Sequence, residues 1–352
     1  MIMENVFNGN LIANASPHVR SKSSTISIMR DVCIALIPCV LASVFFYGAY
    51  AFILIIISVM SAVLAEALFC VIRRRPLTIT DGSAVVTGLI VGLNLPASVP
   101  VSVPIIGSVF AVIVVKMVFG GLGKNFANPA ATARLFLMLA YTSVMTRYLA
   151  PHTSFGEFFD SVDALTGPTP LGGDPASYGL LDLFLGKGIG GAMGETCKAA
   201  VLLGFVYLLI RKVISWRIPV TYVVSFAFFT TLASGFSAGS GKAVLSEVLA
   251  GGLLFGAVFM ATDYATSPKT NAGRMLYALL LGGFTFLIRH FSAYNEGVAF
   301  SIVFMNLLVP LIDQYVLPCR FGSGKKPVLS VVLYSIFGAM AAFTVLFGAI
   351  FF

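Results

Sequence analysis

Between residues 31 and 351 the chain is a succession of long apolar runs separated by mostly short polar connections. A helix needs about 20 mostly apolar residues to cross a bilayer, where no water can satisfy backbone polar groups. We therefore expect an all-α integral membrane protein, a polytopic bundle of about nine to eleven transmembrane helices. The candidate runs lie near residues 31–48, 50–72, 82–97, 101–119, 131–149, 198–214, 218–235, 245–261, 275–289, 298–317 and 328–351.

Composition agrees with this class of protein. The mean hydropathy is +0.97 and only 10% of the residues are charged, against about 25% in soluble domains. The net charge of +8 does not indicate nucleic acid, because the Lys and Arg residues are scattered in short groups without a contiguous basic face. We therefore expect membrane lipids and no nucleic acid as partners. The five cysteines include no CxxC pair, and we expect no metal site.

The basic residues of the connections predict the orientation. With eleven spans, most of them fall on one face, which the positive-inside rule places in the cytoplasm together with the N-terminus. We expect a cytoplasmic segment over 1–30, which does not read as a signal peptide, and membrane halves over 31–149 and 198–352. The acidic connection 150–197 is then extracytoplasmic, in a multi-pass protein of the cell's inner membrane. The basic residues concerned are Arg20, Lys22, Arg30, Arg73, Arg74, Arg75, Lys124, Arg211, Lys212, Arg217, Lys269, Arg274, Arg320, Lys325 and Lys326.

Two apolar helices with similar beginnings and ends suggest an internal inverted repeat that contains half-helices. Asp81 opens one run that reaches Asn94 and a proline, and Glu296 opens another that reaches Asn306 and a proline. An acid at a helix N-terminus is stabilising by itself, so these residues are either helix-end groups or part of an ion path. Transporter folds place ion sites where half-helices of two repeats meet.

Other ionisable residues within the apolar runs have plainer interpretations. Glu66 lies a few residues before a group of arginines, and we expect it to pair with Arg73 or Arg74. Lys116 can extend its ammonium group to the membrane boundary. Arg289 and His290 lie at an outer helix end, where we expect surface groups.

The segment from Asp163 to Leu171 contains the sequence Asp-Ala-Leu-Thr-Gly-Pro-Thr-Pro-Leu. By composition it is a Pro/Gly turn in an exposed loop. The segment also resembles the flavin-attachment motif Asp-x-x-Ser/Thr-Gly-Ala-Thr of the RnfD/NqrB family. The resemblance implies that Thr169 carries FMN through a phosphoester bond, while Asp163, Thr166, Gly167 and Pro168 shape the turn. Pro168 stands where the family usually has Ala.

The resemblance extends over residues 16 to 313 through further segments in the same order. It implies an RnfD-type subunit of an Rnf complex, and the short N-terminal region favours this type over NqrB. The matching positions are 16–18, 28–32, 81–88, 93–96, 120–125, 128–130, Arg134, 261–263, 266–268, Glu296, Gly297 and Asn306.

The implied activity is electron transfer within a ferredoxin:NAD⁺ oxidoreductase that translocates Na⁺ or H⁺. The cofactors would be covalent FMN and a second, noncovalent riboflavin, and no residue of the chain would act as a catalytic acid, base or nucleophile. The partners would be subunits of the RnfA, RnfB, RnfC, RnfE and RnfG types and a flavin transferase. Three alternatives stay open: an NqrB-like subunit of a sodium-pumping NADH:quinone oxidoreductase, an ion channel or secondary transporter without redox function, and a structural anchor for the complex.

Overall fold

The computed structural model describes residues 24–151, 170–173, 175–234, 240–292, 296–317 and 328–351. Every regular element among these residues is helical. The first half contains α1 (Thr25–Ile72), η2 (Ile79–Asp81), α2 (Ser83–Leu93), α3 (Ser102–Val109), η3 (Phe110–Met117), α4 (Pro129–Ala140) and α5 (Thr142–Met145). The rest contains η5 (Pro170–Gly172), η6 (Pro175–Ser177), α6 (Leu180–Leu185), α7 (Lys198–Ile210), α8 (Arg217–Ala233), α9 (Ser240–Leu249), α10 (Leu253–Phe255), η7 (Gly256–Met260), α11 (Asn271–Phe291), α12 (Val298–Tyr315) and α13 (Val328–Phe351).

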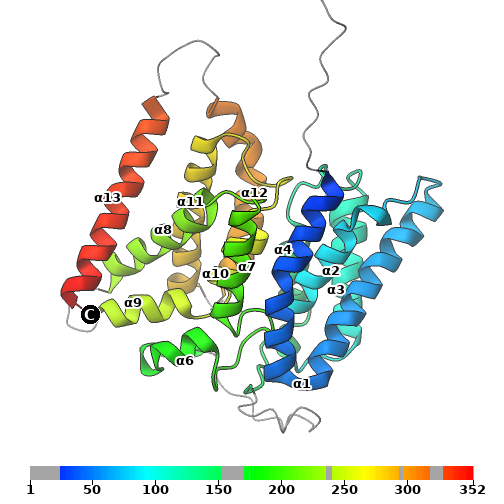
Figure 1. Cartoon of the computed structure of the whole chain (residues 1–352), viewed down its shortest axis with the longest axis horizontal. Helices are drawn as coiled ribbons and strands as arrows, with labels where there is room; N and C mark the ends of the chain where they lie inside the picture. The colour runs from blue at the N-terminus through cyan, green and yellow to red at the C-terminus, as the bar shows by residue number, and fades with distance from the viewer. Residues whose placement is uncertain are drawn as a thin grey trace, which may run out of the picture.

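Helix α1 consists of two arms that meet at Gly48. Gly48 has φ 71° and ψ −164°, a conformation that side chains with a Cβ rarely adopt. The chain therefore turns back at this glycine, and Figure 1 shows the two blue arms diverging from the bend. The two arms correspond to the first two predicted runs, 31–48 and 50–72.

Helix α2 lies against the second arm of α1 through two glycines spaced four residues apart. A Cβ on Gly88 would lie 2.7 Å from Val59 Cα, and one on Gly92 would lie 3.2 Å from Ile55 Cα. The close approach lets Ser58 Oγ donate to the carbonyl of Gly88 at 2.7 Å. Small residues at this spacing allow two helices to pack closely inside a membrane, and here they position the C-terminal end of α2.

Many of the apolar helices are shorter than a membrane span. Three described helices, α1, α11 and α12, are long and apolar enough to cross, and a pair bent by 60°, Gly241–Leu249 with Leu253–Met260, adds a fourth candidate. The shorter apolar helices, such as α2, α4 and α7, have 10–17 residues. The run 82–97, where a half-helix is expected, contains the short helix α2, which ends at Leu93 with Asn94 as its C-cap.

The matching helix of the second half follows its predicted run, 298–317, but differs from α2 in the way it ends. Helix α12 does not end at Asn306 and its proline but continues through Pro310 to Tyr315. Asn306 therefore lies in the middle of a helix, whereas Asn94 lies at the end of one. The two segments are similar in sequence but not in the way their helices end.

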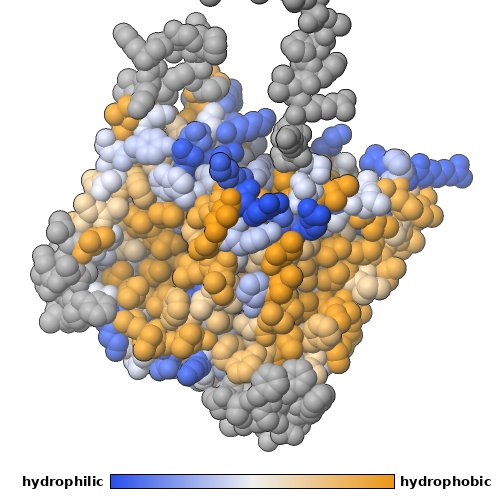
Figure 2. Space-filling model, viewed as in Figure 1, coloured by the Kyte–Doolittle hydropathy of each residue, from blue (hydrophilic) through white to orange (hydrophobic). Residues whose placement is uncertain are grey.

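The two ends of the molecule are distinct. Figure 1 shows the start of α1 at one end, and α6, the break in α1 and the C-terminal end of α13 at the other. Figure 2 shows an apolar surface between these ends, with hydrophilic residues gathered mainly at the end where α1 begins. The structure is that of a multi-pass, all-α membrane protein.

Candidate functional site

The flavin-attachment motif predicted from the sequence lies outside the described residues. This applies to Asp163, Thr166, Gly167, Pro168 and Thr169. The description resumes at Pro170, which is buried. Pro170 lines a small cavity of about 20 Å³, together with glycines of two connections and three ionisable side chains, Glu195, Lys198 and Glu296.

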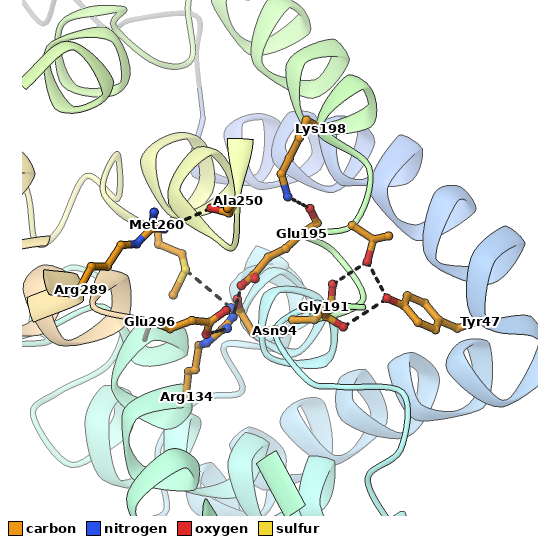
Figure 3. A network of polar contacts seen from close by, with 12 residues as sticks. Tyr47, Asn94, Arg134, Gly191, Glu195, Lys198, Ala250, Met260, Arg289 and Glu296 are labelled. Carbon is orange, nitrogen blue, oxygen red and sulfur yellow. Dashed lines mark hydrogen bonds and ion pairs between the residues drawn. The ribbon is translucent and has the colours of Figure 1, made fainter. Parts of the chain in front are cut away.

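Arg134 is the centre of a buried ionic cluster beside this cavity. Its guanidinium forms ion pairs with Glu195 and Glu296, and its Nη1 donates to Asn94 Oδ1 at 2.7 Å. The side chains of Arg134 and Glu195 are only 6% and 3% exposed. Figure 3 shows Arg134 between Glu296 and Asn94, with Glu195 reaching the same point from the other side. A fork-shaped guanidinium can bridge two carboxylates in this way, because its five donors lie in one plane.

The connection between α6 and α7 brings Glu195 into the cluster. Its backbone is hydrogen-bonded to the end of α2, from Gly194 N to Leu93 O at 2.7 Å and from Met193 N to Leu95 O at 3.0 Å. Tyr47 adds a third attachment through a 2.8 Å contact with Thr196 Oγ1. These bonds hold the carboxylate of Glu195 inside the protein.

The charges of the cluster nearly balance. The buried ammonium of Lys198 donates to the backbone carbonyl of Glu195. The positive charges of Arg134 and Lys198 therefore balance the negative charges of Glu195 and Glu296. Arg289 contributes a third cation, which donates to the carbonyls of Glu247 at 2.9 Å and Ala250 at 3.2 Å.

Glu195 Oε2 is buried and has no hydrogen-bond partner among the described residues. A buried carboxylate oxygen without a partner is costly and marks a position where a ligand, proton or cation could bind.

A series of polar contacts leads from this cluster toward the opposite end. Asn94 Nδ2 lies 3.6 Å from Met260 Sδ, and Asn128 Nδ2 donates to the carbonyl of Met260 at 2.9 Å. Asn306 then accepts from Asn128 N at 3.0 Å and donates to Thr266 O at 3.2 Å. The predicted residues Asn94, Glu296 and Asn306 are therefore brought into one connected set of polar groups.

A second, larger cavity of about 90 Å³ lies at the end of this series. Its walls are mostly apolar, from both halves of the sequence, with polar groups from Asn125, Asn128 and Asp263. Asn125 Oδ1 is buried and has no partner among the described residues. A mostly apolar cavity with a few convergent polar groups is typical of a small-molecule site.

Asp81 belongs to a separate network on the wall of this second cavity. Its Oδ1 accepts from Ser83 N at 2.8 Å and from Ser83 Oγ at 2.5 Å, which stabilises the start of α2. Ser83 Oγ also accepts from Lys116 Nζ at 2.5 Å. Asp81 is thus a helix-end group, joined to the cavity through Ser83 and Lys116.

Three expectations about ionisable residues are wrong. Glu66 pairs with Lys116 at 2.8 Å rather than with Arg73 or Arg74, and both side chains are buried. Lys116 therefore does not extend to the membrane boundary. Arg289 is not a surface group, because its donors bind two backbone carbonyls and its guanidinium lies 4.8 Å from the Phe226 ring centroid. In each case the side chain binds a group that is distant in the sequence and lies inside the bundle.

The sequence interpretation did not identify Arg134, Glu195 and Lys198 as site residues. The available signal was Arg134, a charged residue inside the predicted run 131–149, because ionisable groups within a span are usually paired and functional. Its two carboxylate partners come from connections 61 and 162 residues away. No local pattern could have joined them.

Comparisons with known proteins find relatives over most of the chain. A family model described as the NQR2, RnfD, RnfE family matches residues 12–322. The D subunit of the Na⁺-translocating ferredoxin:NAD⁺ oxidoreductase complex of Acetobacterium woodii is 39% identical over 322 residues, which is 90% of this chain and 96% of that protein. The D subunit of the proton-translocating ferredoxin:NAD⁺ oxidoreductase complex of Clostridium ljungdahlii is 38% identical over 336 residues, 92% of this chain and 98% of that protein. The D subunit of the ion-translocating oxidoreductase complex of Escherichia coli O127:H6 is 34% identical, with 88% and 98% covered.

Proposed function

The chain belongs to the NQR2, RnfD, RnfE family, and we propose that it is the electron-carrying membrane subunit of an Rnf-type complex that translocates Na⁺ or H⁺. The observation that carries this proposal is the match, over nearly their whole length, to proteins named as the D subunits of such complexes. The same coverage favours the RnfD type over the NqrB type. Relatives named for Na⁺ and for proton translocation are about equally similar, so both ions belong to the proposal.

Thr169 is the proposed attachment point for FMN. The support is the Thr-Gly-x-Thr frame of the motif and the position of Pro170, the next residue, in the cavity beside the ionic cluster. Lys198 can balance negative charge there, and the unpartnered Glu195 Oε2 can accept an N–H from a ring system. FMN would supply the redox chemistry, while these residues hold the charge balance and exclude water.

The second cavity is the proposed position of the noncovalent riboflavin. Its apolar walls suit a flat aromatic ring system, and Asn125 Oδ1 is a free acceptor for a ring or hydroxyl donor. Asn128 and Asp263 would complete the polar contacts. In this arrangement the two flavins would lie at opposite ends of the polar series that contains Asn94 and Asn306.

The proposed route places the FMN loop outside the cell membrane and the N-terminus in the cytoplasm. Electrons would pass from an RnfG-type partner to this chain and return to an RnfC-type, NAD-reducing partner. The RnfA, RnfB and RnfE types and a flavin transferase complete the proposed partners. Asn94, Glu296, Asn306 and the Arg134 cluster are the proposed ion path.

Mass spectrometry of the peptide that contains Thr169 tests the cofactor and its site together. The full chain, produced with a flavin transferase, should carry the added mass of FMN minus water on this peptide and fluoresce on a denaturing gel. Thr169→Ala should lose both signals, while Thr153→Ala, a control in the same connection but outside the motif, should keep them. An unmodified Thr169 peptide from active membranes would refute the assignment.

A non-redox ion channel or secondary transporter remains the second candidate. The observation that favours it is the connected set of buried polar groups between the two ends of the bundle. A wild-type protein that is colourless when made with its flavin transferase, yet conducts ions in vesicles, would favour this alternative. A purely structural anchor instead predicts that Thr169→Ala leaves electron transfer by the complex intact.

A further inference from the structure

A basic cleft lies between the α7–α8 connection and the segment that precedes α11. It has a volume of about 210 Å³ and is lined by Lys212, Ser215, Ser267, Tyr264 and Arg274, the last in the first turn of α11, with apolar residues of the α7–α8 connection and the start of α8. No acidic side chain is among the residues that line it. The cleft is separate from the flavin motif and from the Arg134 cluster.

The two cations of the cleft are not neutralised, and the fold fixes the backbone of Lys212 and the guanidinium of Arg274. Lys212 follows α7 in a left-handed conformation with φ 55°, and its amide donates to Leu209 O at 3.0 Å. Arg274 Nε donates to Pro268 O at 3.0 Å, which fixes the direction of its guanidinium. Neither Lys212 Nζ nor the Arg274 Nη atoms have a hydrogen bond or ion pair within the part of the chain that the structure describes. The fold therefore presents two free cationic groups to one small volume.

The surroundings of the cleft are those of a membrane boundary. Ile210, at the end of α7, is 74% exposed, and the aromatic residues Trp216 and Tyr264 are 39% and 53% exposed. Trp and Tyr rings are enriched at the level of lipid headgroups, next to the exposed apolar surface that contacts the acyl chains. A soluble partner would not need this combination of exposed apolar and aromatic groups around a cationic cleft.

We propose that this cleft binds the phosphate group of an anionic phospholipid. Lys212 and Arg274 supply the charge, the hydroxyls of Ser267 and Ser215 are near enough to add hydrogen bonds, and Ile210 and Trp216 contact the acyl chains. Arginine and lysine together recognise phosphate well, because one offers paired donors and the other a compact charge. The proposal does not depend on the proposed redox function.

The cleft also shares a wall with the larger cavity. Val213, Ile214, Thr262 and Tyr264 line both, and Tyr264 Oη donates to the carbonyl of Val213 across this wall. A bound lipid would therefore brace one side of the cavity in which we place the noncovalent flavin. This gives the lipid a structural consequence inside the bundle.

Trp216 provides a direct test, because it is the single tryptophan of the chain. The full chain in a neutral detergent is titrated with short-chain phosphatidylglycerol, phosphatidylcholine or inorganic phosphate while Trp216 fluorescence is recorded, and retained lipids are counted by native mass spectrometry. We expect a saturable change with phosphatidylglycerol, little with phosphatidylcholine, and only weak competition from inorganic phosphate. Lys212→Gln/Arg274→Gln should weaken phosphatidylglycerol binding about tenfold or more, since each basic residue near a membrane surface contributes to lipid attraction.

The matched control is Arg75→Gln/Lys124→Gln, which removes two exposed basic residues outside the cleft. It should leave the affinity within about twofold. Lys212→Glu alone should also weaken binding, and it is a useful second variant because Lys212 is exposed and its replacement does not alter packing. Equal binding by the cleft and control variants would overturn the proposal. A response to inorganic phosphate as strong as that to phosphatidylglycerol would also overturn it, because the site would then take a soluble anion.

Discussion

Arg134 is the residue on which the buried ionic cluster depends. Arg134→Gln leaves the carboxylates of Glu195 and Glu296 without their shared cation, and removal of one partner from a buried pair costs about 3–5 kcal/mol. We expect a large fall in the melting temperature of the purified protein in detergent. Arg147→Gln, at an exposed position, should change it little. A melting temperature equal to that of the wild type would show that the carboxylates do not need Arg134.

The buried ion pair of Glu66 and Lys116 can be tested by replacing its two members separately and together. Lys116→Met alone leaves Glu66 buried without a cation and should destabilise the protein strongly, by about 3–5 kcal/mol. The double variant Lys116→Met/Glu66→Met removes both charges and should recover much of that loss, because an apolar pair needs no desolvation of ions. Thermal denaturation of the wild type, the two single variants and the double variant forms a double-mutant cycle, which measures the interaction free energy between Glu66 and Lys116. Additive effects would mean that the two side chains do not act as a pair.

At the scale of single elements, the break in α1 depends on Gly48. Its backbone conformation is outside the range of ordinary L-residues, so Gly48→Ala should cost about 1–3 kcal/mol. Gly338→Ala in α13 is the control, because a Cβ there meets open space and alanine favours a helix. We expect Gly48→Ala to unfold at lower temperature and Gly338→Ala to unfold at the wild-type temperature or above. If Gly48→Ala unfolded at the higher temperature of the two variants, the turn between the arms of α1 would not depend on Gly48.

At the scale of the whole molecule, the orientation in the membrane can be measured by cysteine labelling in intact cells. Lys212 lies at the end of α7 and Leu181 lies in α6, at the opposite end of the bundle, where its side chain is 75% exposed. A membrane-impermeant maleimide should label Leu181→Cys in intact cells and Lys212→Cys only after the membrane is opened. Labelling in the opposite pattern would contradict the proposed orientation and place the flavin loop in the cytoplasm.

Most of the helices could be predicted from the sequence, because a bilayer forces each apolar run to satisfy its own backbone hydrogen bonds. The runs at 31–48 and 50–72 became the arms of α1, and the glycine-rich run at 82–97 became the short helix α2. The apolar run 298–317 predicted the extent of α12, whereas its sequence similarity to α2 did not, because α2 ends next to Asn94 and α12 continues past Asn306. Pro310 does not end α12. Proline lacks a backbone donor, but neighbouring helices and side chains can satisfy the backbone group that it frees inside a membrane bundle.

The candidate site was predictable only in part. Asn94, Glu296 and Asn306 were identified one by one and lie in a connected set of polar groups, whereas Asp81 stabilises the start of α2. The assignment of FMN to Thr169 remains a prediction from the motif. The partner of Glu66 was predicted wrongly, because Lys116 is nearer in space than the arginines that follow Glu66 along the chain. Arg289 was predicted as a surface group, but it binds two backbone carbonyls.

The sequence by itself determined the class of the protein, its helices and its family, because hydropathy and short motifs are local properties of the chain. Only the tertiary structure decided which charges meet inside it. Arg134, Glu195 and Glu296 are far apart in sequence, and each alone would be costly to bury in an apolar interior. They are stable there because the packing of α4, the α6–α7 connection and the segment before α12 brings them within hydrogen-bonding distance of one another, which is a property of the whole bundle.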